Sequence, residues 1–139
     1  MNELDKINEN IGADISYETV LSPFEETNKV HFNLLNEMVG KLEKEAEIIC
    51  DMTYGPKPLP IVMFSMLNFA EKFFDAQVKN IIYGKVDFVD DEKNPGKTTP
   101  ANPVIYDVVS LYLVNSVTNV MEHENTEDAV KGLGVLLGL

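Results

Sequence analysis

The sequence predicts an all-α fold, a single-domain helical bundle spanning residues 1–139. The chain has 139 residues, of which 45% are hydrophobic, and both values are typical of one folded domain. Apolar residues recur at helical spacing over three long segments, about 23–53, 59–83 and 103–122. Proline or glycine stands near the ends of these segments, where helices characteristically start and stop. Two further short helices complete the predicted bundle.

The first long helix is predicted over about 23–53. Ser22, Pro23 and Glu25 form a capping-box pattern with proline at the first helical position. The apolar stripe that follows contains Phe24, Leu35, Met38, Leu42, Ala46 and Ile49. An unkinked helix of this length would be about 45 Å long, whereas a compact chain of this size has a radius of gyration of about 14 Å. A helix longer than the body favours a subunit of a larger assembly.

The other two long helices are predicted from nearly continuous apolar segments. Over 59–83, the polar residues form only a narrow stripe, so this helix should be covered on most sides. Over 103–122, Asn102 is the expected cap and Pro103 the first helical residue. The β-branched content of this third segment leaves strand as a minority alternative. Residues 85–101 between the two helices are predicted to be loop.

Short elements are expected toward both ends of the chain. Residues 2–11 can form a short helix with isoleucine and leucine on one face. Residues 14–21 alternate weakly, which allows a short β pairing with 85–89. Asn125 or Thr126 is expected to cap a last short helix.

Charge excludes several classes of partner. The chain carries 23 acidic and 11 basic residues, a net charge of -12, and every basic residue is lysine. Arginine is the usual side chain for phosphate recognition, and a negative field repels polyanions, so we expect no direct contact with nucleic acid or a membrane. The longest stretch without charged residues is too short to span a bilayer. The acidic start of the chain does not resemble a secretion signal. With Cys50 as the single cysteine, we expect a cytoplasmic location or one within a phage particle.

No catalytic, cofactor-binding or metal-binding residue is predicted, and no cofactor is expected. His123 stands directly between Glu122 and Glu124, whereas helical metal sites use the spacing Glu-x-x-His. The acidic stretch 87–92 lacks the ligand spacing of a calcium loop. Cys50 lies beside a carboxylate, which disfavours a reactive thiolate.

The predicted interface lies at the C-terminus. Residues 132–139 form a glycine-rich apolar segment, too short to be a stable helix alone, that contains Leu133, Val135, Leu136, Leu137 and Leu139. Burying these side chains contributes roughly 10 kcal/mol, and ordering the segment costs about 12 kcal/mol. We therefore expect a docking tail that becomes ordered only in an existing groove. His31, in the apolar stripe of the first long helix, is the other interface candidate, expected to be a core or interface histidine.

These features predict a non-enzymatic structural or assembly protein, an acidic helical interaction subunit of a homo- or hetero-oligomeric complex. Small acidic helical chains without catalytic motifs are common among phage structural and accessory proteins, which is an analogy at the level of the fold. Protein partners are expected, with self-association favoured. The alternative is an acidic inhibitor that occupies a basic site on a nucleic-acid enzyme, because its field would steer it toward a basic groove. An enzyme is the least favoured interpretation.

Overall fold

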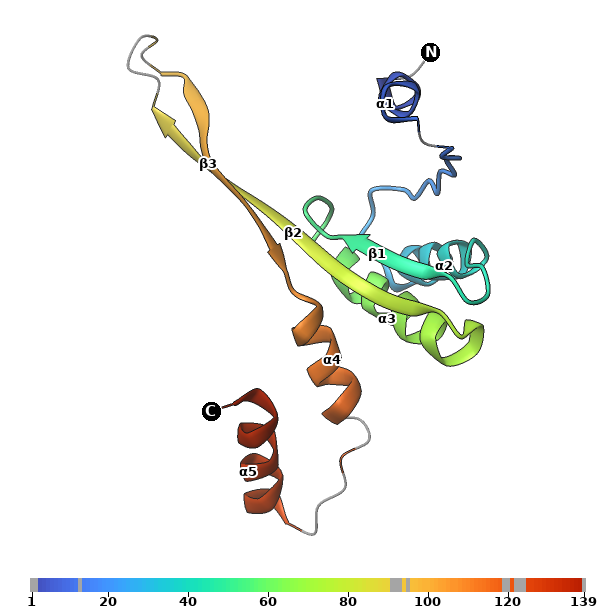
Figure 1. Cartoon of the computed structure of the whole chain (residues 1–139), viewed down its shortest axis with the longest axis vertical. Coiled ribbons are helices and arrows are strands. Elements are labelled where there is room, and N and C mark those ends of the chain that lie inside the picture. The colour runs from blue at the N-terminus through green and yellow to red at the C-terminus, as the bar shows by residue number, and fades with distance from the viewer. Residues whose placement is uncertain are drawn as a thin grey trace.

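The computed structural model (Figure 1) describes residues 3–12, 14–90, 94, 96–118, 121 and 125–138. The described residues form five helices and three strands, in the order α1 (Glu3–Ile11), α2 (Asn28–Val39), β1 (Glu47–Asp51), α3 (Leu59–Phe74), β2 (Gln77–Asp90), β3 (Thr98–Asp107), α4 (Val109–Thr118) and α5 (Thr126–Leu137). The chain is therefore an α/β protein. The all-α helical bundle predicted from the sequence is wrong.

The three strands form one mixed sheet in the order β1-β2-β3. β1 runs parallel to β2, with α3 as the crossover between them, and β2 runs antiparallel to β3. β1 pairs only with residues 77–82 of β2, whereas β3 pairs with β2 as far as Asp90. The outer part of this hairpin, residues 84–90 with 98–105, is thus a two-stranded ribbon, which we call the arm. Figure 1 shows the arm projecting past the helices.

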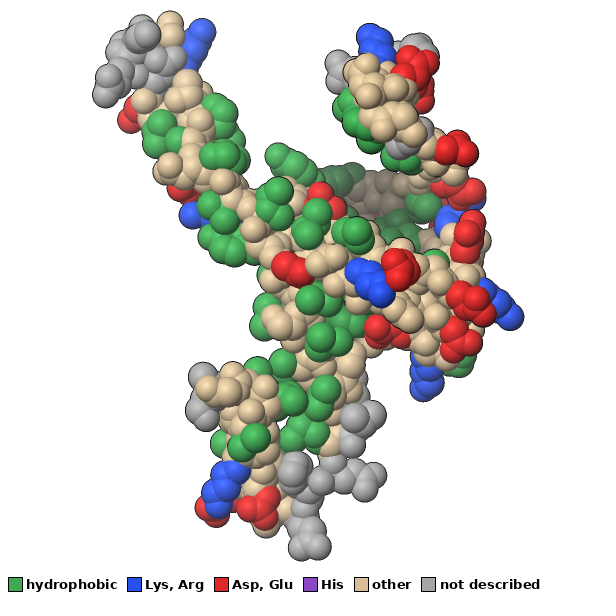
Figure 2. All heavy atoms as spheres, viewed as in Figure 1, with side chains coloured by type: hydrophobic (Ala, Val, Ile, Leu, Met, Phe, Trp, Pro, Cys, Tyr) green, Lys and Arg blue, Asp and Glu red, His purple; other side chains and the backbone are tan. Residues whose placement is uncertain are grey.

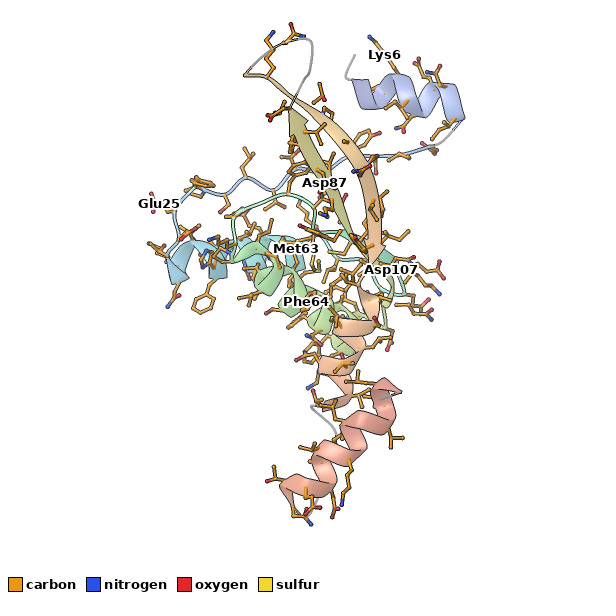
Figure 3. The ribbon with its side chains drawn as sticks, turned by 90° about the vertical axis from the view of Figure 1, so that its left-hand side faces the viewer. Lys6, Glu25, Met63, Phe64, Asp87 and Asp107 are labelled. Carbon is orange, nitrogen blue, oxygen red and sulfur yellow. The ribbon has the colours of Figure 1, made fainter. Side chains whose placement is uncertain are left out.

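The hydrophobic core lies between the helices and one face of the sheet. Its buried members are Cys50, Met66, Leu67, Ile81 and Tyr112. Figures 1 and 3 show α2 and α3 on the same side of the sheet, and α2 packs on α3. Alternation along β1 places Ile48 and Cys50 in the core and turns Ile49 to the opposite face. The fold has two layers, in which α2 and α3 cover one face of the sheet.

The helix predicted over 23–53 is mostly wrong, because α2 is far shorter. The predicted cap at Ser22 is wrong too, since no helix begins there. The observed cap is Thr27, whose hydroxyl accepts a hydrogen bond from the backbone N–H of Val30 at 3.3 Å. The helix ends at Gly40, so the 45 Å rod that favoured an assembly role does not exist.

β1 is formed by residues predicted to be the end of that helix. Ile48, Ile49 and Cys50 are a short apolar run that fits a strand as well as a helix. Tertiary contacts decide between them. The backbone N–H of Glu45 donates to the carbonyl of Phe74, and β1 then pairs along β2.

The helix predicted over 59–83 ends early, at Phe74. Asp75 adopts a left-handed backbone conformation with φ of 52°, and its N–H donates to the carbonyl of Ala70, which ends α3. The remaining apolar residues of the predicted helix enter β2, where they pair with strands on both sides.

The helix predicted over 103–122 is wrong in its first part, because residues 98–107 form β3. The β-branched side chains that left strand as an alternative pack in a sheet here. Asn102 has φ of 49° beside the register shift between β2 and β3, as at a β-bulge. The pairing expected between 14–21 and 85–89 does not form, since 85–89 pairs with β3 and 14–21 contains no strand.

α1 and α5 coincide with the two short helices expected toward the ends of the chain. The side-chain oxygen of Asn125 accepts a hydrogen bond from the backbone N–H of Asp128 at 3.0 Å, which caps α5 as expected. The segment predicted as a separate tail, 132–139, is helical as far as Leu137. These residues are the second half of α5, which starts from its cap at Asn125 and continues through Gly132 and Gly134. Leu139 lies outside the described residues.

Candidate interaction surface

The arm exposes large apolar side chains on a part of the sheet that projects from the body. Phe88 is 66% exposed and Ile105 is 74% exposed, and Val89 and Val104 are exposed beside them. Figure 2 shows hydrophobic side chains along the visible face of the arm. An isolated two-stranded ribbon is at best marginally stable in water, and contiguous apolar patches mark interaction sites. The arm is therefore the strongest candidate for a protein-protein interface.

Two hydrogen bonds hold the base of the arm against the body. The backbone N–H of Gly84 donates to the hydroxyl of Thr53 at 2.8 Å, and the N–H of Met52 donates to the carbonyl of Ile82 at 2.9 Å. A Cβ atom on residue 84 would lie 3.1 Å from the side chain of Thr53, so glycine permits this close approach. The loop after β1 thereby sets the direction in which the arm leaves the sheet.

Replacing Thr53 with valine should weaken this base. Thr53→Val leaves the part-buried N–H of Gly84 without its acceptor, and we expect the free energy of unfolding to fall by about 1–2 kcal/mol. Thr53→Ser keeps the hydroxyl and is the matched control, expected to lose less than half as much. Urea unfolding at one fixed protein concentration measures both. An equal loss in the two variants would show that the hydrogen bond contributes nothing.

Asp107 joins the end of the arm strand to the next helix. Its carboxylate accepts hydrogen bonds from the side-chain amide of Asn80 at 2.6 Å and the backbone N–H of Val109 at 3.0 Å. These bonds lower the pKa of Asp107 below its ordinary value of 3.8, with the bond from Asn80 as the largest cause. Figure 3 shows Asp107 where β3 leads into α4, with Asp87 farther out on the arm. One carboxylate therefore fixes the junction of β2, β3 and α4.

The stabilisation by Asp107 should depend on pH. Because its pKa is lower in the folded chain, its contribution is fully present above the ordinary value of 3.8 and is lost as pH falls through the lower folded value. We expect wild type to be more stable than Asp107→Asn at about pH 7 and the difference to shrink below about pH 4. Parallel denaturant titrations of the two proteins measure it. A difference that stays constant with pH would contradict the assignment.

The sheet face opposite the core is also apolar. Ile49 is 66% exposed there, and Ile82, next to the buried Ile81, is half-buried on the same face. In the view of Figure 1, β1 and β2 lie in front of α2 and α3, so this face is turned toward the reader. We call the surface around Ile49 and Ile82 the open face. Like the arm, the open face is an apolar surface that α2 and α3 do not cover, because both helices lie on the other side of the sheet.

α4 is anchored to the body by one buried tyrosine. Tyr112 is fully buried, its ring meets Phe64 of α3 edge-on with centroids 5.5 Å apart, and its hydroxyl donates to the carboxylate of Glu71 at 2.6 Å. Burial, followed by this hydrogen bond, raises the pKa of Tyr112 well above its usual value. The group is therefore a neutral structural donor.

The C-terminal interface candidates lie on α5. Leu133 is half-buried and lines a shallow pocket of about 530 Å³ together with Met121 and Val130. Val135 is 82% exposed, and Leu136 and Leu137 are each nearly half exposed. The structure thus leaves most of these candidates accessible, as a docking role requires, without showing what they contact.

His31 lies on α2 at the edge of a different pocket. The pocket has a volume of about 220 Å³ and is lined mainly by apolar residues, among them Phe24, Leu34 and Leu59. His31 is half-buried there. The structure therefore does not bring His31 together with Leu133, the C-terminal candidate that lines the other pocket.

The remaining candidates considered from the sequence are the possible metal ligands, the acidic stretch that begins at Asp87, and the Cys50 thiol. No group of three or more metal-binding side chains occurs among the described residues, and Glu122, His123 and Glu124 lie outside them. Asp87 forms an ion pair with Lys85 at 2.9 Å. Burial raises the pKa of the Cys50 thiol to about 11, with the neighbouring carboxylate as the smaller cause.

The chain matches no protein family, no curated protein and no solved structure in the comparisons with known proteins. Among the described residues, no helix is long and apolar enough to cross a membrane.

Sequence reasoning missed the arm and the open face. The available signal was the β-branched and aromatic content of 80–89 and 98–109, which is typical of strands, although only a brief strand at 85–89 and strand as an alternative within 103–122 are predicted from it. The paired prolines at 100 and 103 also fit an edge strand, where a missing N–H is tolerated.

Proposed function

We propose that the chain is a non-enzymatic assembly protein, a subunit of a homo-oligomer held together through the arm. The observation that supports this proposal is the amount of exposed surface. The chain exposes 11028 Å², whereas a compact monomer of 15.6 kDa exposes about 7200 Å². Divided between two contacts, the excess of about 3800 Å² per chain gives interfaces within the total range that obligate oligomers bury. An assembly role in the cytoplasm or within a phage particle suits such a subunit.

Light scattering after size exclusion tests the proposal. We expect a mass that is a multiple of 15.6 kDa and stays constant on dilution into the low micromolar range. A monodisperse monomer of 15.6 kDa across the whole concentration range would overturn the proposal, because the excess surface would then be solvated.

Deleting residues 132–139 tests whether α5 takes part in assembly. We expect a smaller oligomer, with the melting temperature of the remaining chain nearly unchanged, because α5 contributes no residue to the buried core. If instead melting falls and the oligomer persists, the C-terminal segment stabilises its own chain and is not an interface. Light scattering and thermal circular dichroism provide the two measurements.

The second candidate function is the acidic inhibitor of a nucleic-acid enzyme. The net charge of -12 supports it, since a strong negative field raises the association rate with a basic groove. Salt separates the two candidates: binding driven by charge weakens steeply as salt is raised, whereas contacts between apolar surfaces do not. Recovery of a nuclease or polymerase that is released by moderate salt would favour the inhibitor.

A further inference from the structure

No described part of the same chain covers the apolar side chains of the arm. The arm projects away from its own helices (Figure 1), so its apolar side chains cannot be buried by the body from which it grows. If the chain is a homo-oligomer, as proposed above, the covering surface is on a second copy. The open face of the sheet is the best match for it on the described part of the chain.

The open face and the arm are both apolar surfaces of the sheet. A β-ribbon and a sheet pack face to face with side chains interdigitating across about 10 Å. Ile49 and Ile82 supply the apolar contact, and Lys79 and Glu47 balance each other at the margin in an ion pair of 2.9 Å. A neighbouring carboxylate, that of Asp107, already accepts hydrogen bonds within its own chain. These donors are neutral, so Asp107 keeps its charge and has to stay at the solvated margin of the contact.

Strand addition at the edge of the arm is a poorer way to bind it. Pro100 and Pro103 have no N–H group, so β3 lacks two donors that an added strand would need. Prolines on an edge strand characteristically prevent such pairing. The β2 edge of the arm has no proline, but the largest exposed apolar side chains, Phe88 and Ile105, project from the faces of the arm, so we take a face as its contact surface.

The size of the excess surface favours two interfaces per chain. A standard interface takes about 800 Å² from each partner, and obligate interfaces bury 2000–5000 Å² in total. One two-fold contact that removed about 3800 Å² from each chain would bury about 7600 Å², which is beyond that range. If each chain makes two contacts, each interface buries about 3800 Å² in total, which is within the range of obligate oligomers. Two different contacts per chain are the mark of a head-to-tail arrangement.

We infer that the arm of one copy lies face to face on the open face of the next copy, in a head-to-tail contact that repeats around a ring or along a filament. This inference rests on the proposed function and adds to it the two surfaces that meet. Each chain then contributes one arm and one open face, and a copy at an open end leaves one of the two surfaces free.

Mixing two monomeric variants tests the arrangement. Phe88→Asp damages only the arm and Ile49→Asp only the open face, and both side chains are 66% exposed, so both variants should fold. Each variant alone should be a monomer at a concentration where wild type is an oligomer. An equimolar mixture should form a heterodimer of twice 15.6 kDa, because one intact arm meets one intact open face. The same introduced residue in both variants prevents an artificial ion pair.

The control is Ile61→Asp on α3, which lies on the helical side of the sheet and is 72% exposed. It should leave the oligomer unchanged. A mixture that stays monomeric would mean that the arm does not bind the open face, and an oligomeric Ile49→Asp would place the receptor elsewhere. Either result overturns the inference while an oligomeric wild type still supports the proposed function. A monomeric wild type overturns both.

Discussion

A chain whose arm is replaced by a two-residue turn is expected to be a folded monomer. Lys85 and Val104 are paired across the hairpin, so residues 86–103 can be replaced by Asn-Gly, which closes two antiparallel strands in a type I′ turn. Among the removed residues that the structure describes, none belongs to the hydrophobic core or packs against it. We expect the dissociation constant of the oligomer to rise at least 100-fold, about 2.7 kcal/mol, with the helical circular dichroism of the body retained.

Sedimentation over a concentration series measures this dissociation constant. The control is Lys85→Gln, which removes the ion pair with Asp87 at the arm but leaves its apolar side chains, and it should assemble as wild type does. An oligomer that persists without the arm would contradict the proposed interface and direct attention to α5 or α1. Loss of the folded body would instead show that the arm supports its own chain.

Loss of the Tyr112 side chain should cause the largest fall in stability. Tyr112 is fully buried and links α4 to α3 through both its ring and its hydroxyl. We expect Tyr112→Ala to lower the free energy of unfolding by about 3–5 kcal/mol, which is a large fraction of the 5–15 kcal/mol typical of a folded domain. Tyr112→Phe keeps the ring and removes only the bond to Glu71, so it should lower that energy by about 1–2 kcal/mol.

Urea denaturation at a fixed protein concentration separates these contributions. The matched control is Leu111→Ala, the preceding residue of α4, which is exposed and should change stability by less than about 0.5 kcal/mol. Similar losses in Tyr112→Ala and Leu111→Ala would mean that α4 is not anchored through the tyrosine. A Tyr112→Phe variant as stable as wild type would mean that solvent replaces the hydrogen bond to Glu71.

The interface candidates illustrate what one sequence can and cannot indicate. The apolar residues on α5 were found from composition alone, because leucine and valine near a chain end are unusual without a partner. Phe88 and Ile105 were missed, because residues 85–101 were predicted to be loop and the apolar run around Ile105 was assigned to a helix. Their exposure matters only once β2 and β3 are seen to extend beyond the helices.

Local signals determined the parts of the fold that depend on nearby residues. The sequence alone predicted the net charge of -12, the absence of arginine, the short terminal helices and the cap of α5 at Asn125. Each of these depends on composition or on contacts within about four residues. The hydrophobic content also indicated an apolar core, and the sequence contains no recognised catalytic or metal-binding motif.

Tertiary structure decided the fold class, because the strands depend on distant partners. Cys50 pairs with Ile81, and the backbone N–H of Ile81 donates to the carboxylate of Asp107, 26 residues farther along the chain. The runs around Ile49 and Ile105 are short, apolar and rich in β-branched residues, so their spacing fits helix and strand alike. Only pairing across the sheet, which satisfies their backbone hydrogen bonds, selects the strand and with it the arm.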